Sequence, residues 1–196
     1  MQITKRHAWI YGVSMAVYIG TFILRSATDR PVSWMYFLIA LALQTACFLF
    51  LRNAPSLVFM GASGFVTCAL YFGSMLDFYH VFSWYDLFLH GTSGFLLFFA
   101  GHFFYRFLLR KHPPAQIPLA LPIFFDLFVS TACAGLWEIY EFSADYLLGQ
   151  HMQGPMTDSM TDMIAGTIGA IVAAVLVYRR LKRTPPDPDS RKIFTL

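Results

Sequence analysis

Residues 128–145, FVSTACAGLWEIYEFSAD, begin as an apolar run and end with three carboxylates. The first half is typical of a membrane-spanning helix, which needs about 20 mostly apolar residues in all. The second half holds Glu138, Glu141 and Asp145, spaced three and four residues apart. On a helix this spacing places the three side chains on one face. The stretch therefore predicts a membrane helix with an acidic face near one end.

The composition of the whole chain agrees with that interpretation. Of its 196 residues, 57% are hydrophobic and 13% are charged, and the mean hydropathy is +0.56. This is too apolar for an ordinary soluble domain. Six apolar segments are long enough to span a membrane: residues 8–25, 33–51, 56–76, 86–109, 117–147 and 159–181. The sequence predicts an all-α polytopic bundle of six transmembrane helices over residues 1–183, with a disordered cytoplasmic tail over residues 184–196.

The basic residues are distributed unevenly between the two ends of these segments. With six spans and the N-terminus inside, twelve of the 14 Lys and Arg residues fall at inner ends. Only Arg25 and Arg30 fall at outer ends. The positive-inside rule then places both termini in the cytoplasm. Trp34, Trp84 and Trp137 would lie near the outer interface and Trp9 near the inner one, as in an aromatic belt.

In this topology most of the acidic residues fall on the outer side of the membrane. The outer loops and outer helix ends would hold Asp29, Asp77, Asp86, Glu138, Glu141, Asp145, Asp158 and Asp162. Carboxylates this concentrated repel one another unless they are solvated, protonated or bound to cations. The face that carries them is therefore the first place to look for a site.

A second acidic pattern opens the fourth span, in YDLFLHGTSGFLL. Asp86 and His90 are four residues apart and share a face, so the carboxylate can orient the imidazole or the two can bind one metal. Gly91 and Gly94 would let a neighbouring helix approach closely. In the alternative interpretation, Asp86 caps the helix N-terminus and His90 makes one structural hydrogen bond.

A third acidic pattern opens the sixth span, in GPMTDSMTDMIAGTIGAIVAA. Asp158 and Asp162 are again four residues apart. Thr157 or Asp158 is a plausible N-cap after the Gly-Pro turn, but capping does not account for Asp162. Gly166, Gly169 and Ala170 form a small-residue packing face beyond it; at most one of the two aspartates is then explained by the helix end.

Together these spans predict a metal site at the outer membrane face. The expected ligands are His90, Glu138, Glu141, Asp145 and Asp162, and Asp86 and Asp158 are the expected catalytic base or supporting groups. Oxygen ligands with an imidazole suit zinc, manganese, iron, magnesium or calcium. No HExxH, GxSxG or P-loop pattern is present, so the prediction rests on arrangement and not on a diagnostic motif. Solvated carboxylates on exposed helix ends are the alternative.

Other polar residues carry weaker predictions. Asp77, His80 and His151 are expected in solvated loops, and Arg25 and Arg30 could pair with the carboxylates or bind a headgroup phosphate. Asp126 lies deeper, where an ionisable residue is a functional candidate, or else it pairs with Arg or Ser from a neighbouring helix. His7, His102 and His112 are expected to be ordinary interfacial residues, and Cys47, Cys68 and Cys133 small buried residues without metal-ligand spacing.

Three blocks, DLFLHGTSGF, WEIYEFSADYLLG and MTDSMTDMIAGTIGA, resemble the YjdF-like bacterial inner-membrane proteins, a family without an established function. The likeness covers roughly residues 77–175. The first block is also distantly similar to VanZ-like proteins, which carry an Asp-x-x-x-His pattern at a helix start. The resemblance implies that the seven site residues named above are the polar signature of the chain, and it implies no catalytic role.

The sequence thus favours a metal-dependent hydrolase or transferase of the bacterial inner membrane, with a site that faces the periplasm. We expect a membrane lipid or another amphiphile as substrate and no nucleic-acid partner. A proton- or cation-coupled transporter or channel is the first alternative. A non-catalytic membrane protein with a structural ion site or a partner-binding surface is the second.

Overall fold

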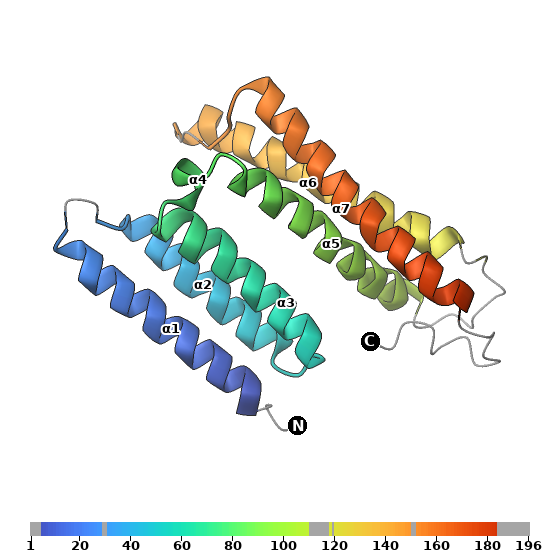
Figure 1. The fold of residues 1–196 in the computed structure, drawn as a ribbon, viewed down its shortest axis with the longest axis horizontal. Coiled ribbons are helices and arrows are strands. Elements are labelled where there is room, and N and C mark those ends of the chain that lie inside the picture. The colour runs from blue at the N-terminus through green and yellow to red at the C-terminus, as the bar shows by residue number, and fades with distance from the viewer. Residues whose placement is uncertain (1–4, 29–30, 110–117, 119, 150–151, 184–196) are drawn as a thin grey trace. The chain divides into compact units, whose positions relative to one another are not determined.

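The computed structural model describes residues 5–28, 31–109, 118, 120–149 and 152–183, and the described residues are almost entirely helical (Figure 1). The elements are α1 (Lys5–Ser26), α2 (Trp34–Leu51), α3 (Ser56–Val66), the π-helix η1 (Thr67–Met75), α4 (Phe78–Val81), α5 (Tyr85–Leu109), α6 (Ala120–Leu148) and α7 (Met156–Arg183). Six helices are long and apolar enough to cross a membrane, with α3 and η1 counted as one. The predicted fold class and its six spans are confirmed.

The helix bounds follow the apolar runs closely, because a run of about 20 apolar residues can satisfy its backbone in lipid only as a helix. The largest differences, of three residues each, lie at the starts of the first span, which begins at Lys5 and not at residue 8, and of the last two spans. α6 begins at Ala120, after the predicted residue 117, and α7 begins at Met156, before the predicted residue 159. The helix thus starts one residue ahead of the predicted cap at Thr157.

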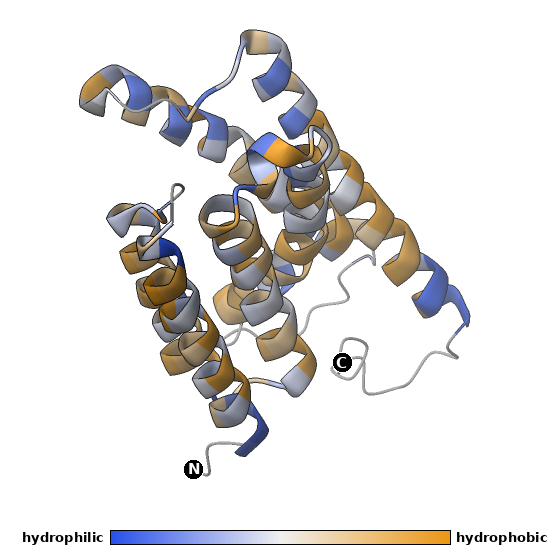
Figure 2. Ribbon diagram, turned by 60° about the vertical axis from the view of Figure 1, so that its left-hand side comes forward, coloured by the Kyte–Doolittle hydropathy of each residue, from blue (hydrophilic) through white to orange (hydrophobic). Residues whose placement is uncertain are grey.

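The outer surfaces of the helices are apolar. Figure 2 shows hydrophobic residues along most of each long helix, and hydrophilic residues at both ends of α7. All four tryptophans predicted to lie at the membrane interfaces are exposed: Trp9, Trp34, Trp84 and Trp137. Exposed apolar side chains on this scale are stable in lipid and costly in water.

The chain divides into two compact units, and the boundary between Leu89 and His90 falls inside α5. The first unit holds α1 to α4 and the first turn of α5, and the second holds the rest of α5 with α6 and α7. The prediction of a single transmembrane domain over residues 1–183 stays a prediction. The predicted tail, residues 184–196, lies outside the described residues.

A line of polar side chains on α1 binds the first unit together. Tyr11 bonds to Thr45 on α2 at 3.1 Å, Tyr18 to Thr67 at 2.9 Å, and Thr21 to Tyr71 at 3.0 Å. The three α1 residues are spaced by seven and three, so they share one face of the helix. Hydrogen bonds of this kind hold helices together in lipid, where the hydrophobic effect between helices is absent.

The same face of α1 carries a polar residue at each end. His7 is fully buried and bonds to the carbonyl of Arg52 and the hydroxyl of Ser56. Its predicted place as an ordinary interfacial residue was wrong, because two polar groups from the α2–α3 connection and the start of α3 compensate its burial. At the other end Arg25 donates to the carbonyl of Met75 at 2.8 Å.

The π-helix η1 was not predicted from the sequence. Its wider turn changes which carbonyls point outward, and two of them accept side-chain bonds. Arg25 bonds to Met75, as described, and the hydroxyl of Tyr85 donates to the carbonyl of Cys68 at 2.9 Å. These bonds compensate the irregular backbone inside an apolar span.

We expect Tyr18→Phe to destabilise the protein by about 1 kcal/mol, the order of a single interhelical hydrogen bond in a membrane protein. Tyr18 is fully buried, and Thr67 donates to the carbonyl of Ser63, so Tyr18 is the donor to Thr67. Reversible unfolding in detergent measures the change. Tyr36→Phe, at an exposed position on α2, is the matched control; an equal loss in both variants contradicts the assignment.

In the second unit α6 and α7 lie antiparallel and in contact (Figure 1). Its apolar core consists of Phe98 from α5 with Ala170, Ala173 and Ala174 from α7. Small residues at these positions allow the helices to approach closely, which replaces hydrophobic attraction with dense packing.

Glycines make the closest contact between α5 and α7. A Cβ atom added at Gly94 would collide with the backbone of Gly166, and one added at Gly169 would collide with the carbonyl of Gly91. The prediction that these glycines allow a neighbouring helix to come close is confirmed. The contact fixes how the polar residues one turn away are placed.

Candidate metal centre

The α5 side of the site consists of two residues on successive turns. Asp86 lies in the first turn, where a carboxylate complements the partial positive charge of a helix N-terminus. His90 follows four residues later on the same face. The hydroxyl of Ser93 donates to the backbone carbonyl of His90 at 2.8 Å.

The α7 side of the site is Asp162, whose side chain is buried, with only 4% of the residue exposed. The Gly94–Gly166 contact one turn away draws this part of α7 against α5. As a result, His90 Nε2 lies 3.9 Å from Asp162 Oδ2. Asp86, His90 and Asp162 each offer one ligand atom, and the three atoms lie within 4.8 Å of one another.

This spacing is close to that of a metal-ligand set. Two ligand atoms on opposite sides of an ion at about 2.2 Å are about 4.4 Å apart. Without a cation, two carboxylates at this separation repel each other by on the order of 3 kcal/mol at an effective dielectric of about 20. A divalent ion would remove that repulsion and bind two oxygens and one nitrogen.

Glu138 on α6 is a fourth acidic residue at this level. A Cβ atom added at Gly166 would lie 3.1 Å from the Cβ of Ala134 and 3.6 Å from the carbonyl of His90. Because α6 and α7 run antiparallel, one turn onward on α6 corresponds to one turn back on α7. Glu138 therefore stands at the level of Asp162.

The carboxylate of Glu138 is unusual in its burial. The residue is 5% exposed, and neither carboxylate oxygen accepts a hydrogen bond from the residues that the structure describes. A buried carboxylate in that condition costs free energy, which a proton or a cation would recover. Glu138 was predicted as a ligand, and its depth is consistent with a role at the site.

The other predicted site residues lie outside the group formed by Asp86, His90 and Asp162. Glu141 accepts a hydrogen bond from the indole of Trp137 at 2.8 Å on the exposed side of α6. Asp158 lies in the first turn of α7, exposed, with its carboxylate against Gly154. Their predicted roles as ligand and base stay predictions.

Asp145 shapes the connection between α6 and α7. Its two carboxylate oxygens accept bonds from the backbone amides of Met152 and Gln153, at 2.8 and 2.9 Å. These bonds satisfy amides that have no helical partner and set where α7 begins. The contact gives Asp145 a structural role, and its predicted role as a metal ligand stays a prediction.

We expect Asp145→Ala to loosen this connection without affecting metal binding. Loss of both acceptors exposes the amides of Met152 and Gln153, so their hydrogen exchange should become at least about tenfold faster, the equivalent of about 1.4 kcal/mol. Exchange mass spectrometry of the loop measures the effect, with elemental analysis of the same sample. Loss of bound metal in Asp145→Ala would support the predicted role of Asp145 as a metal ligand.

The weaker predictions fare differently. Asp77 and His80 bond to each other at 2.6 Å on an exposed loop, as expected for solvated residues, and Asp77 adopts a left-handed backbone with φ 68°. The three cysteines are free and only half-buried. Arg30, His112 and His151 lie outside the described residues.

His102 is the residue that the sequence analysis misjudged most. It was predicted to be interfacial, but it is buried and bonds to the fully buried Asp126 at 3.0 Å. Asp126 was predicted either to be functional or to pair with Arg or Ser, and its partner is His102 instead. The signal in the sequence was that both residues are ionisable and lie inside apolar segments, seven and nine residues from the nearer end.

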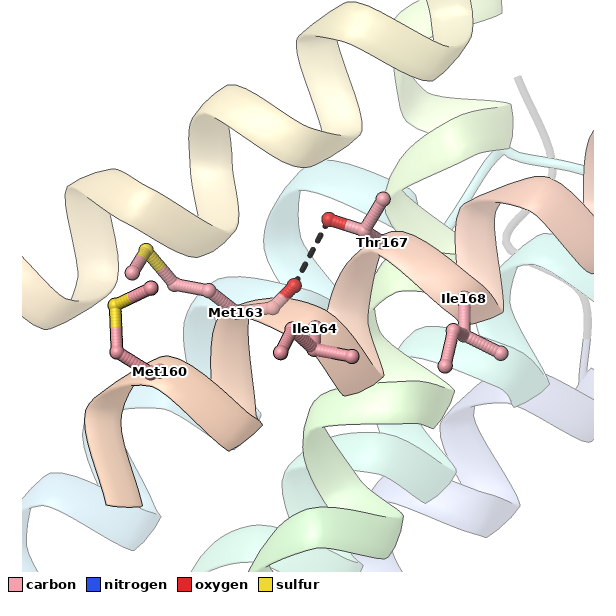
Figure 3. Close-up of a pocket in the computed structure, with 5 residues that line it drawn as sticks. All are labelled: Met160, Met163, Ile164, Thr167 and Ile168. Atoms are coloured by element: carbon pink, nitrogen blue, oxygen red, sulfur yellow. Dashed lines mark hydrogen bonds between the residues drawn. The ribbon is translucent and has the colours of Figure 1, made fainter. Parts of the chain in front are cut away.

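A shallow apolar hollow lies on the outside of α7. Its lining consists of Met160, Met163, Ile164, Thr167 and Ile168 (Figure 3). The hydroxyl of Thr167 is turned back onto the carbonyl of Met163 at 2.8 Å, so the hollow presents no ionisable group.

Comparison with known families identifies the family of the chain. A family model described as "Predicted membrane protein (DUF2238)" matches residues 6–183. The chain belongs to the DUF2238 family. This agrees with the six apolar spans and makes the chain a multi-pass membrane protein. Searches of curated proteins and of solved structures gave no match for this DUF2238 protein. The likeness to YjdF-like and VanZ-like proteins is not confirmed by the comparison.

Proposed function

We propose that this DUF2238 protein is a metal-dependent hydrolase or transferase that acts on a lipid or lipid-linked substrate at the outer face of the bacterial inner membrane. The observation that carries the proposal is the group of three ligand atoms, from Asp86, His90 and Asp162, within 4.8 Å of one another. Such a group inside an apolar bundle is a functional candidate by default.

The ligand chemistry supports a catalytic ion. Three protein ligands leave coordination positions for water and substrate, as in known catalytic sites. Two carboxylate oxygens and one imidazole suit manganese, zinc, iron, magnesium or calcium. When bound, the ion would supply a water of lowered pKa and polarise the bond to be cleaved.

Glu138 would act as the general base. Its carboxylate is buried at the level of Asp162 and accepts no hydrogen bond from the described residues. It would take one proton from the attacking water and later return it to the leaving alkoxide, so that protons balance over the cycle. An acyl or phosphoryl ester fits this reaction.

An amphiphilic substrate follows from the place of the site. The helices that carry it expose apolar side chains, so a substrate reaches it most directly along the lipid phase. The charge distribution favours an orientation with the same helix ends at the outer headgroup level, where the ester bond of a lipid lies.

Turnover in proteoliposomes tests the proposal. Purified protein in vesicles of phosphatidylglycerol and phosphatidylethanolamine, with Mn²⁺ added outside, should release a headgroup or acyl product, and chelation should stop the release. Glu138→Gln should reduce the rate by about 10²- to 10⁴-fold, the range of general-base catalysis, and leave Mn²⁺ bound.

Two results would contradict the proposal that the protein is an enzyme. Movement of Mn²⁺ or protons across the vesicle without any product would favour the transporter. A stoichiometric ion with every position filled by protein would favour a structural site, because a catalytic ion keeps an open position.

A further inference from the structure

A second ionisable site lies in the same unit, away from the metal centre. His102 Nδ1 and Asp126 Oδ2 are 3.0 Å apart, across the contact of α5 with α6. Asp126 is fully buried, and His102 is 8% exposed. A Cβ atom added at Gly101 would lie 3.1 Å from the Cα of Asp126, so the two backbones are in close contact here.

The second oxygen of Asp126 is the informative one. Asp126 Oδ1 is buried and accepts no hydrogen bond from the described residues. One imidazole therefore compensates only half of a carboxylate in an apolar span. The free energy of this arrangement depends on whether a proton occupies the pair.

The depth of the pair separates it from the metal centre. Asp126 and Glu138 both lie on α6, twelve residues or about 18 Å apart along the axis. Between them are Ser130, which bonds to the carbonyl of Gly94 at 2.8 Å, and Ala134. Asp126 is six residues, or about 9 Å, from the start of α6, so water at that membrane face is the nearer source of protons.

We propose that the His102–Asp126 pair is a proton-binding site buried in the second unit. The pair gains one proton from water at the near membrane face and later releases it to the same face, with no other change in charge. In the unprotonated state neutral His102 donates its Nδ1 hydrogen to Asp126 Oδ2. The added proton resides on Asp126 Oδ1 or on His102, because a pair this close titrates as one unit. The proposal does not depend on the metal centre.

Few other titratable groups face the pair. Tyr105 on α5 has its ring 6.0 Å from the ring of His102, and Arg106 follows on the exposed side of that helix. The other neighbours on α6 are Ile123 and Leu127, which belong to the core built on the alanines of α7. Tyr105 is therefore a neighbour to control when a proton bound by the pair is measured.

Infrared difference spectroscopy of the full chain in lipid nanodiscs, between pH 8 and pH 5, tests the proposal. A protonated carboxyl in apolar surroundings gives a carbonyl band separate from those of ionised carboxylates. We expect such a band in the wild type and its loss in Asp126→Asn. His102→Gln, which keeps the carboxyl, should shift the midpoint of the band by at least about one pH unit.

Two controls make the result decisive. Glu138→Gln, which removes the other buried carboxyl of α6, and Tyr105→Phe should both keep the band of Asp126, and circular dichroism should show unchanged helix content in every variant. If Asp126→Asn does not fold, the shift in His102→Gln alone carries the test. The proposal is overturned if the carbonyl band and its midpoint are the same in wild type and His102→Gln, or if Asp126→Asn keeps the band. Either outcome would mean that the His102–Asp126 pair is a structural contact that does not bind a proton in this pH range.

Discussion

Replacing Asp162 by asparagine should remove bound divalent metal from the purified protein. The substitution keeps the size of the side chain but removes the charge of a ligand that lies 3.9 Å from the imidazole of His90. Changes to residues that merely support metal ligands cost about 10- to 100-fold in affinity, so loss of a ligand charge should cost at least about 100-fold. Elemental analysis after detergent purification should find stoichiometric metal in the wild type and little in the variant.

Metal should stabilise the wild type and leave the stability of the variant unchanged. Without metal, Asp162→Asn relieves the repulsion between two carboxylates, so at pH 8 the variant should unfold at the same or a higher temperature than the wild type. With metal at about 100 times its dissociation constant, the wild type should gain about 2.7 kcal/mol and the variant nothing. A variant that is simply misfolded would be less stable in both conditions.

Asp158→Asn is the matched control for this experiment. Asp158 lies one turn earlier on α7, but it is exposed and packs against Gly154. It should keep the metal content of the wild type. Equal metal loss in both variants would show that the ion is held by the general acidity of the outer face and not by the three-residue group.

Adding a single methyl group at Gly94 should separate α5 from α7. A Cβ atom there collides with the backbone of Gly166, and neither backbone can move without shifting a whole helix. Overpacking of this kind costs about 3 kcal/mol. We expect Gly94→Ala to lower the unfolding free energy by that amount and to reduce metal affinity, because it moves His90 away from Asp162.

Gly135→Ala provides the control in the same unit. A Cβ atom at Gly135 meets only the sulfur of Met163 at 3.8 Å, an ordinary contact. Both substitutions raise helix propensity equally, so that contribution cancels in the comparison. Similar unfolding free energies for the two variants would mean that α5 and α7 are not in contact through Gly94.

The spans were predictable because their cause is local: an apolar run must form a helix in lipid. Helical spacing likewise predicted that Asp86 and His90 share a face and that glycines line the contact with α7. The contact of Asp86 and His90 with Asp162 could not be predicted from helical spacing alone. It also required the topology, because patterns on separate spans had to lie at the same membrane depth.

The acidic stripe of α6 shows where spacing alone is insufficient. Glu138 and Asp145 lie on nearly the same face, but they are about 10 Å apart along the axis. α7 covers the first and the loop before α7 binds the second. A helical wheel gives the angle between residues but not their separation along the helix axis, so it could not distinguish the role of Glu138 from that of Asp145.

Two further features were beyond the sequence analysis because their partners are distant in the chain. The polar line on α1 consists of tyrosine and threonine hydroxyls whose function appears only opposite Thr45, Thr67 and Tyr71. The pair of His102 with Asp126 joins two residues of different helices at a depth that composition does not specify.

The central claim is that Asp86, His90 and Asp162 bind one divalent ion. Pulsed electron paramagnetic resonance of protein loaded with Mn²⁺ tests it most directly, because a directly bound imidazole nitrogen gives a characteristic hyperfine coupling. The account predicts that coupling in the wild type and its loss in His90→Gln. Mn²⁺ bound without nitrogen coupling, or coupling that persists in His90→Gln, would contradict the proposed centre.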